Sequence, residues 1–366
     1  MYLIAICTLL IFLTLFFGKL NQKTLIDPNG EARQVTTGRG LLAFALILVV
    51  TSTLRYGFID TYAYKIMYTE SRGDLNYVYS EPWGVESGWL LFLYYLNYLS
   101  ASPKLMLFIV ALLINLAYVF LAKKYSSDTI LSLAIYFCVN YMDTNNGVRQ
   151  IFATAIIMLA FPLLLNKKYI LYALLVWFAS FFHESALYVL LIALICIGKP
   201  LNFRVIIGLI LCVVFLIAPS LVSEFLQETV INEKYEFYLD MSSGMGIMRC
   251  FIIAIVPLVL AIIFFIKKKA NDEKISRSDA LLFNLTIMNS AFYLMGLYMA
   301  YWARLAFYTS FAPIILMPKL IDVVFTKKHA KLIKILAFSL YLIFFAYNIY
   351  VNIAYGAIAD FYISWS

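Results

Sequence analysis

The sequence predicts an all-α protein that crosses a membrane many times, and three observations support this fold class. Of the 366 residues, 64% are hydrophobic and only 13% are charged, whereas soluble domains are about half apolar and a quarter charged. The mean hydropathy is +0.89. Apolar runs recur along the whole chain, and a helix of about 20 such residues crosses a bilayer. Runs such as LLAFALILVVTSTL lack the alternation typical of a membrane β-barrel strand.

About twelve transmembrane helices are predicted, within a single membrane domain over residues 1–366. They lie near residues 2–18, 40–54, 104–122, 126–142, 150–165, 169–182, 185–198, 205–220, 250–266, 281–300, 305–318 and 332–355. The apolar segment 87–100 is too short to be a confident span, and it is rich in Tyr. If it crossed the membrane, every later lysine cluster would fall outside. We therefore expect an interfacial helix near 87–100 on the outer surface, where aromatic rings prefer to lie.

The basic residues set the orientation of the chain in the membrane. With the N-terminus outside, the inward-facing breaks hold 20 of the 28 basic residues, in clusters such as AKK, NKK and IKKKA. This is the asymmetry of the positive-inside rule. The net charge of +8 therefore indicates cytoplasmic loops and no nucleic-acid partner. The polar residues with possible chemistry fall on the outer face, and neither a P-loop nor a GxGxxG motif occurs in the sequence.

Three arginines of the predicted outer face share a sequence context. Arg149, Arg249 and Arg304 each stand just before an apolar run, in GVRQIFATAI, IMRCFIIAI and WARLAFYTS. A helix N-terminus already carries about half a positive charge, so a cation there is locally unfavourable. A bound anion would remove this penalty, because backbone N–H groups and guanidinium groups both suit phosphate. The alternative is that these side chains extend to lipid headgroups.

Two outer loops, 55–103 and 221–249, are predicted to form the substrate site. The first begins RYGFIDTYAYKIMY and mixes charged residues with Tyr62, Tyr64, Tyr68, Tyr77, Tyr79 and Trp83. Aromatic faces beside carboxylates and hydroxyls suit sugar rings, although an interfacial aromatic belt would have the same composition. The second loop is acidic and ends in SSGMGIMR, whose glycines permit a mobile lid.

One histidine of the two lies on the predicted outer face. His183 directly precedes an apolar run, with Glu184 beside it. Histidine gains and loses a proton near neutral pH, so His183 is a candidate general base. A satisfied interfacial residue is the alternative. No second histidine or paired carboxylate stands at metal-ligand spacing from it, so neither a metal nor another cofactor is predicted.

Five stretches together resemble the EpsG family of bacterial exopolysaccharide polymerases, which are Wzy-like in role. They are STLRYGFIDTYAY (52–64), EPWGVESGWLLF (81–92), NNGVRQIFATAI (145–156), FFHESALYVLL (181–191) and WARLAFY (302–308). The pattern covers most of the chain. Each motif is short, and their order and outward placement carry the resemblance.

The resemblance implies a metal-independent glycosyltransferase of the bacterial cytoplasmic membrane, with its site facing outward. It would join undecaprenyl-diphosphate-linked oligosaccharide units into exopolysaccharide or capsular polysaccharide. Arg149 would hold the diphosphate, His183 would activate the attacking hydroxyl, and Asp60 is a further catalytic candidate. The candidate substrate-binding residues are Arg55, Tyr64, Glu81, Trp83, Glu86, Asn145, Asn146, Gln150, Arg249 and Arg304. Membrane lipid, a flippase and a chain-length regulator are the implied partners.

Three rival functions remain open on the sequence. A metal-dependent lipid-sugar glycosyltransferase usually carries paired acids in its first outer loop, whereas Asp60 has no adjacent acid. A flippase or other transporter would place its charged residues near the bilayer midplane. A membrane O-acyltransferase also needs one histidine at membrane level, but no site for an activated acyl donor is recognisable.

Overall fold

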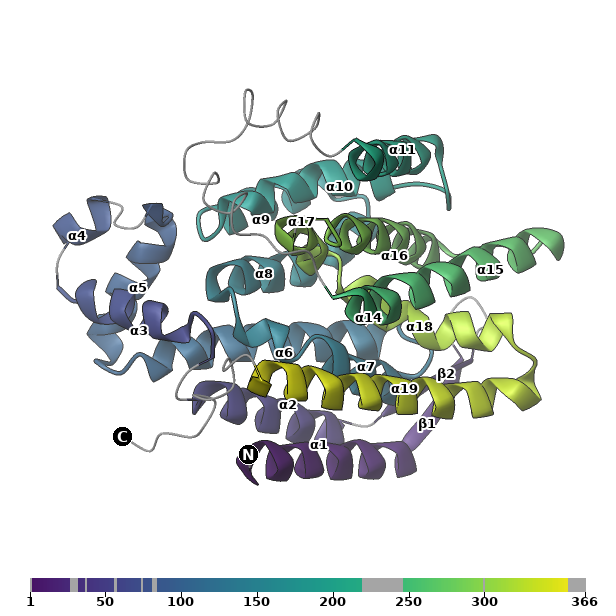
Figure 1. Cartoon of the computed structure of the whole chain (residues 1–366), viewed down its shortest axis with the longest axis horizontal. Helices are drawn as coiled ribbons and strands as arrows, with labels where there is room; N and C mark the ends of the chain where they lie inside the picture. The colour runs from purple at the N-terminus through teal and green to yellow at the C-terminus, as the bar shows by residue number, and fades with distance from the viewer. Residues whose placement is uncertain are drawn as a thin grey trace. The chain divides into compact units, whose positions relative to one another are not determined.

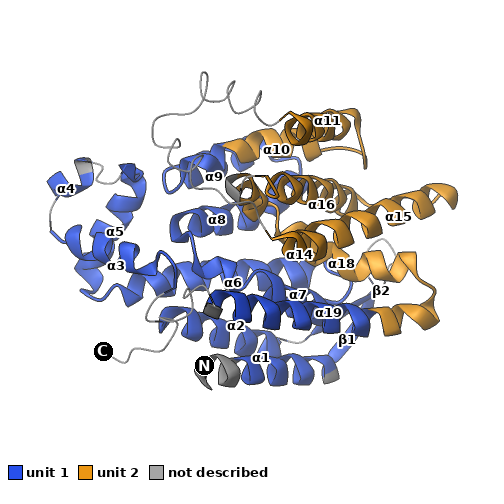
Figure 2. Cartoon of the chain, in the orientation of Figure 1, with its two compact units in different colours: residues 1–187, 334–366 blue, residues 188–333 orange. Residues whose placement is uncertain are grey.

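The computed structural model consists almost entirely of helices, as the sequence predicts, and it divides into two compact units. Unit 1 comprises residues 1–187 and 334–366, and unit 2 comprises residues 188–333 (Figure 2). Each unit is described by itself. The structure describes residues 2–26, 32–36, 38–55, 58–73, 75–80, 84–218, 246–298 and 300–354. The predicted substrate loop 221–249 therefore lies outside the described residues, except for its last four positions.

Unit 1 is a bundle of helices with three further helices at one end (Figure 1). The bundle consists of α1 (Tyr2–Leu20), α2 (Gly38–Thr53), α6 (Lys104–Tyr125), α7 (Thr129–Val139), α8 (Val148–Leu165), α9 (Tyr169–Ser180) and the part of α19 (Lys327–Ala354) from Lys334 onward. The three at one end are α3 (Thr61–Glu70), α4 (Leu75–Tyr79) and α5 (Ser87–Leu99), and the unit also has the 3-10 turns η2 (Asp143–Asn145) and η3 (Glu184–Leu187). The segment between α2 and α5, treated as a loop in the sequence, thus contains helices α3 and α4.

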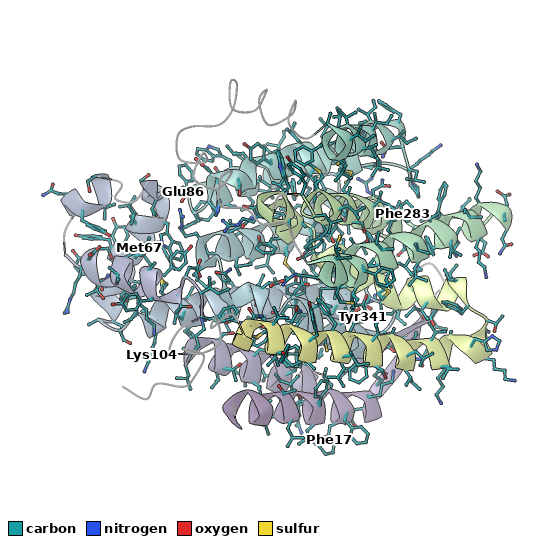
Figure 3. The ribbon with its side chains drawn as sticks, in the orientation of Figure 1. Phe17, Met67, Glu86, Lys104, Phe283 and Tyr341 are labelled. Carbon is teal, nitrogen blue, oxygen red and sulfur yellow. The ribbon has the colours of Figure 1, made fainter. Side chains whose placement is uncertain are left out.

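Aromatic side chains fill the centre of unit 1, and some of them carry buried hydrogen bonds. The rings of Tyr118 on α6 and Tyr136 on α7 stack with centroids 3.8 Å apart. Tyr136 donates to Asn115 Oδ1 at 2.8 Å, and Asn140 Nδ2 donates to the Tyr118 hydroxyl at 2.9 Å. Because these buried polar groups are paired, they do not carry the penalty of an unsatisfied group. Tyr341 of α19 is likewise inside the unit, whereas Phe17 of α1 points away from it (Figure 3).

A β-hairpin between α1 and α2 is the exception to the all-α prediction. Strands β1 (Gln22–Ile26) and β2 (Ala32–Thr36) pair antiparallel, with Gln22 opposite Thr36. The sequence between them, DPNGE, contains residues typical of turns, a signal that the prediction of an inward-facing loop over 19–39 did not use.

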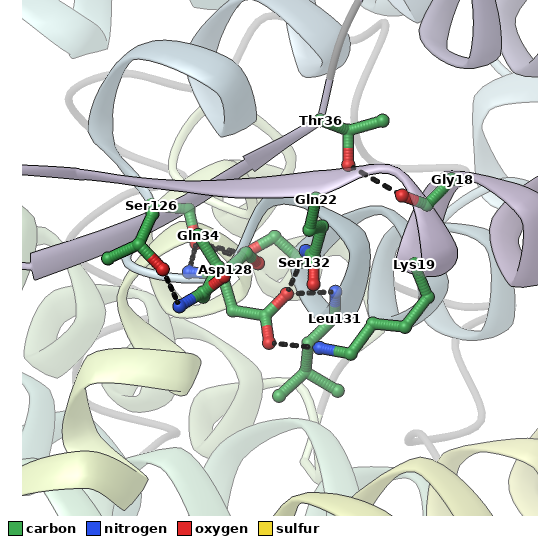
Figure 4. A network of polar contacts seen from close by, with 10 residues as sticks. Gly18, Lys19, Gln22, Gln34, Thr36, Ser126, Asp128, Leu131 and Ser132 are labelled. Atoms are coloured by element: carbon green, nitrogen blue, oxygen red, sulfur yellow. Dashed lines mark hydrogen bonds and ion pairs between the residues drawn. The ribbon is translucent and has the colours of Figure 1, made fainter.

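The Asp128 carboxylate fixes the hairpin to the start of α7. It accepts from Lys19 Nζ at 2.9 Å, Gln22 Nε2 at 2.9 Å and the Leu131 amide at 3.2 Å (Figure 4). Lys19 supplies the positive charge that pairs with this buried carboxylate. A charged carboxylate therefore caps α7 and anchors the hairpin.

The loops of unit 1 gather at two ends, because successive long helices run in alternating directions (Figure 1). At one end the Gly147 amide donates to Asp60 Oδ2 at 2.9 Å. At the other end the Gln34 amide donates to the Ser127 carbonyl at 2.8 Å, within the hairpin network. Residues predicted to face outward in this unit thus share one end, and those predicted to face inward share the other.

Helix α5 begins and finishes at the same end of unit 1. Glu86 at its start pairs with Arg149, and the Ser100 carbonyl after its last turn accepts from the Tyr68 hydroxyl of α3 at 2.7 Å. Asn97 Nδ2 also donates to the Tyr68 carbonyl, at 2.8 Å. A short helix at 87–99 therefore exists as expected, and its location at the membrane surface stays a prediction.

Unit 2 surrounds one almost fully buried helix, α16 (Arg277–Met295). Its other helices are α10 (Tyr188–Cys196), α11 (Phe203–Ile217), α14 (Ile247–Cys250), α15 (Val256–Ala270), α17 (Ala300–Ala303) and α18 (Phe311–Val324), with the π-helix η5 (Phe251–Ile255) and the 3-10 turn η6 (Arg304–Tyr308). Asn284 Nδ2 of α16 donates to the Cys196 carbonyl at 2.8 Å, and Asn289 Nδ2 donates to the Ala306 carbonyl at 2.9 Å. These amides tie the loops of the unit to its central helix.

Four helical runs are long and apolar enough to cross a membrane by length and composition. They are Lys104–Tyr125, Val148–Leu165, Ile247–Ala270 and Lys327–Asn352. Six further apolar helices of 10–17 residues are present in the described part of the chain. Helices thus occupy the predicted positions and the chain is a membrane protein, while the number of about twelve crossings stays a prediction.

Cysteine labelling of intact cells tests the predicted orientation. We expect Tyr62→Cys and Arg72→Cys, both at exposed positions before α4, to react with a membrane-impermeant maleimide. Lys124→Cys and Lys274→Cys, which are also exposed, should react only after the cells are opened. In intact cells, labelling of both lysine variants together with Tyr62→Cys would mean that α5 crosses the membrane, whereas labelling of both lysine variants without Tyr62→Cys would reverse the orientation.

Candidate functional site

Arg149 is positioned by the conformation of the preceding glycine. Gly147 is the N-cap of α8 and has φ +61°, a left-handed conformation that residues other than Gly, Asn and Asp rarely adopt. The turn η2 (Asp143–Asn145) leads into it, so the sequence NNGVRQ is a turn followed by the first turn of a helix. Arg149 is the second residue of α8, as expected for an arginine at a helix start.

Asp60 and Arg55 hold the chain before α3 against the start of α8. Asp60 Oδ2 accepts from the Gly147 amide at 2.9 Å, one of the donors that a helix start leaves unsatisfied. Arg55 is buried and donates to the carbonyls of Ser52 and Asn145 and to Thr61 Oγ1. Burial lowers the pKa of Arg55 to about 10, so it remains charged at neutral pH. Both residues therefore have structural contacts in addition to their predicted roles.

Glu86 connects the two residues with the strongest predicted roles. Its Oε2 is bonded to Arg149 Nη1, and its Oε1 accepts from the Glu184 amide at 3.0 Å. Oε1 also lies 3.8 Å from Nδ1 of His183. The side chains of Arg149, Glu86 and His183 are 21%, 13% and 19% exposed, so the group is largely but not fully shielded from solvent. Glu86, and not the adjacent Glu184 considered in the sequence, is the carboxylate placed against the His183 ring.

His183 lies between α9 and η3, and its ring is held by Ser185. Ser185 Oγ is 3.1 Å from Nδ1, and the Ser185 amide donates to Nδ1 at 3.4 Å. The His183 amide donates to the Ala179 carbonyl at 3.3 Å, which fixes the backbone after the last turn of α9. Nδ1 is therefore the nitrogen that faces protein groups, whichever tautomer the ring adopts.

Tyr64 of α3 bonds to the Arg149 guanidinium. Burial and the charge of Asp60 raise the pKa of Tyr64, and Arg149 only partly opposes them, so the hydroxyl keeps its proton at neutral pH.

Arg149 Nε is buried and has no hydrogen-bond partner among the described residues. Besides the donor that bonds to Glu86, the guanidinium therefore has at least one further N–H group without an acceptor among the described residues.

An aromatic layer lies under these polar groups. Trp89 of α5 is fully buried and contacts Tyr64, Phe92 and Phe152 with ring centroids 5.9, 5.5 and 6.1 Å apart. Phe152 of α8 also contacts Phe182, at 4.7 Å. Buried aromatic contacts of this kind each contribute about 0.5–1.5 kcal/mol beyond the area that they bury. The layer joins α3, α5, α8 and the end of α9, and so supports the polar cluster from below.

Gly88 lets α5 approach the chain that carries His183. A Cβ added at Gly88 would lie 2.4 Å from the Phe181 carbonyl oxygen and 2.6 Å from Phe181 Cβ, closer than real Cβ atoms come. We expect Gly88→Ala to separate α5 from residue 181, to lower the free energy of unfolding by about 1–3 kcal/mol and to reduce activity. Thermal unfolding and a polymer assay measure this. Gly38→Ala, where nothing lies within 4 Å, is the matched control, and equal behaviour of the two variants would contradict the close contact.

The structure brings together most of the predicted site residues that it describes in unit 1. Tyr64, Glu86, Arg149 and His183 are linked through direct contacts, Asp60 accepts from the Gly147 amide two positions before Arg149, and Arg55 bonds to the Asn145 carbonyl. Asn145 and Gln150 are buried, and Asn146 is half-buried, at the same turn.

Four predicted residues are not part of this cluster as described. Glu81 and Trp83 lie outside the described residues. Arg249 and Arg304 belong to unit 2, where Arg249 is in the first turn of the helical run 247–270 and Arg304 opens the 3-10 turn η6. Their predicted roles stay predictions.

Gly88 and Ser185 support the candidate site but were not predicted from the sequence. Gly88 has no signal beyond a glycine at a predicted helix start. Ser185 stands two positions after His183, a spacing that allows a local side-chain bond.

The family model of the EpsG family matches residues 40–362, nearly the whole chain. The chain belongs to the EpsG family. This match includes all five stretches on which the resemblance rests. Membership points to a function like that of an exopolysaccharide polymerase, with activity of the glycosyltransferase type. No curated protein and no solved structure matches the chain.

Proposed function

We propose that this EpsG-family protein joins undecaprenyl-diphosphate-linked oligosaccharide units at the outer face of the bacterial cytoplasmic membrane. The observation that carries the proposal is the contact of Glu86 with both Arg149 and His183. One cluster thus combines an arginine at a helix start, suited to a diphosphate, with a histidine suited to proton transfer.

The proposed reaction transfers the growing chain to an incoming unit. An acceptor hydroxyl oxygen attacks the anomeric carbon of the donor sugar, and the bond from that carbon to the diphosphate oxygen breaks. The hydroxyl proton passes to His183, and undecaprenyl diphosphate leaves with the bonding electron pair. Arg149 stabilises the negative charge that grows on the leaving oxygen, an effect that is strengthened where water is excluded.

The neighbouring side chains suit the sugar and phosphate groups of such a substrate. Asn145, Asn146 and Gln150 supply amides at the start of α8, and the backbone N–H groups of a helix start suit an anion. Tyr64 supplies a protonated hydroxyl next to Arg149. Glu81 and Trp83 are proposed to contact sugar. Arg249 and Arg304 are proposed to bind further phosphate oxygens.

No metal ion takes part in the proposed reaction, because the arginines and the helix start supply the positive charge. Among the described residues, no three His, Cys, Asp or Glu side chains gather as metal ligands. The proposed partners are a flippase, which delivers units to the outer face, and a chain-length regulator. Activity that disappears with EDTA and returns with a divalent cation would favour the metal-dependent rival.

This function is tested in cells that lack the protein, by measuring on which side of the membrane the unpolymerised lipid-linked units accumulate. We expect single lipid-linked repeats to accumulate at the outer surface, where added periodate oxidises their sugars without opening the cells. Re-expression of the protein should convert them to polymer. If the repeats accumulate instead on the inner face, protected from periodate until the cells are opened, the protein is a flippase and the proposal is wrong.

A further inference from the structure

Glu86 stands at the N-cap position of α5 but does not cap that helix. Its backbone has φ −59° and ψ 131°, and its side chain makes no capping bond to α5. Carboxylates at this position commonly accept from the backbone N–H groups of their own helix. The side chain instead extends to α8 and to the loop after α9, so its contacts are made with the candidate site.

Both oxygens of this carboxylate are used within the site. Oε2 bonds to Arg149, while Oε1 accepts from the Glu184 amide at 3.0 Å and lies 3.8 Å from His183 Nδ1. We propose that Glu86 is a positioning residue that couples the phosphate-binding arginine to the base. This inference rests on the proposed function and adds a residue role to it.

The contacts around the His183 ring give the physical basis of this coupling. Nδ1 faces Ser185 and Glu86, and when Nδ1 carries the ring hydrogen and donates it toward them, Nε2 is the nitrogen that accepts the hydroxyl proton. When Nε2 takes the proton, the ring becomes a cation, and the Glu86 carboxylate stabilises it. A carboxylate behind a catalytic histidine acts in this way in other enzymes. The two atoms are 3.8 Å apart, and catalytic contacts of this length commonly shorten when substrate binds.

The bond to Arg149 makes the same carboxylate sensitive to the donor. Arg149 is shared between Glu86, Tyr64 and the proposed diphosphate. When a bound diphosphate attracts Arg149, the pairing between Arg149 and Glu86 weakens. The negative charge of Glu86 is then less neutralised and stabilises a protonated His183 more strongly. Three charged groups therefore affect the charge of the His183 ring. Glu86, at the start of α5, faces the ring directly, and Arg149 of α8 acts by pairing with Glu86. Glu184 is the adjacent residue in the chain.

Glu86→Gln tests the coupling, because glutamine keeps an oxygen acceptor but removes the negative charge. The assay measures polymerisation of lipid-linked units by the full-length protein in proteoliposomes as a function of pH. We expect kcat to fall by about 10–100-fold with KM changed much less, since the interaction matters in the transition state. We also expect the acidic limb of the rate–pH profile to move to lower pH, because His183 loses the charge that favours its protonated form.

Matched variants separate positioning from structure. Glu273→Gln removes a carboxylate outside the predicted substrate loops, whose partner is Lys268 Nζ at 2.6 Å, and should leave both rate and profile unchanged. Glu86→Asp keeps the charge and should recover part of the rate. The double variant Glu86→Gln/His183→Gln should be no slower than His183→Gln alone, because coupled residues are not additive. Thermal unfolding confirms that each variant is folded.

The possible outcomes are distinct. A slower Glu86→Gln variant with an unshifted acidic limb, or additive losses in the double variant, would show a merely structural residue and overturn the inference. Wild-type rates in Glu86→Gln would overturn it as well. If the wild-type protein forms no polymer from any lipid-linked unit, the proposed function is wrong, and the inference that rests on it falls with it.

Discussion

Arg149→Lys is expected to reduce polymer formation by about 10²–10³-fold while leaving the protein folded. Lysine keeps the positive charge and can still pair with Glu86, so the loop before α5 should stay attached to α8. It cannot reproduce the planar group of donors that binds two phosphate oxygens at once. The size of the loss is that of removing one preorganised donor from a site where negative charge develops. Polymer per unit of membrane-inserted protein is the measurement.

Arg149→Ala should also abolish polymer, but its effect on stability has to be separated from its effect on activity. It leaves the Glu86 carboxylate, only 13% exposed, without its cation, so some loss of stability is expected in addition to the loss of activity. Arg72→Ala, an exposed arginine in the turn after α3, is the matched control and should polymerise normally. Wild-type polymer in a folded Arg149→Lys variant would contradict a diphosphate site at Arg149.

His183→Gln is expected to lower the polymerisation rate by about 10²–10⁴-fold, the usual contribution of a positioned general base. Glutamine keeps hydrogen-bonding capacity near Ser185 and Glu86 but cannot accept the hydroxyl proton. Single lipid-linked repeats should therefore accumulate, and they should still bind to the purified variant. Isotopically labelled repeats and a binding measurement separate the chemical step from substrate binding.

His329→Gln is the matched control, because His329 is the other histidine and belongs to unit 2, at the start of α19. It should leave polymerisation unchanged. If His183→Gln polymerises as the wild type does, the histidine only supports the loop. The base would then have to be Asp60, Glu81 or Glu86.

Helix positions were predictable from the sequence because long apolar runs are a strong and local signal. Helices occur at the expected runs, including the short one at 87–99. The hairpin at 22–36 was missed, because its two short strands are recognisable only with the turn sequence between them. Helices α3 and α4 were not predicted, because charged and aromatic residues are mixed over 61–79 and no long apolar run indicates a helix there.

The site was predictable in its residue types but not in its pairing. A polar turn before an apolar helix singled out Arg149, and a histidine at a helix boundary singled out His183. The contact of Glu86 with Arg149 joins residues 63 positions apart and depends on how α5 lies against α8 and α9. Likewise, only the fold shows that Gly88 touches the Phe181 carbonyl. Local patterns indicate candidates, whereas the pairing follows from the packing of separate helices.

The most direct test of the central claim uses purified wild-type protein in liposomes with a defined undecaprenyl-diphosphate-linked oligosaccharide, in the presence of EDTA. We expect polymer of increasing length, with one molecule of undecaprenyl diphosphate released for each linkage formed. The Arg149→Lys variant in the same liposomes should release almost none. Movement of the lipid-linked unit across the bilayer, with neither polymer nor released undecaprenyl diphosphate, would contradict the claim and identify a transporter.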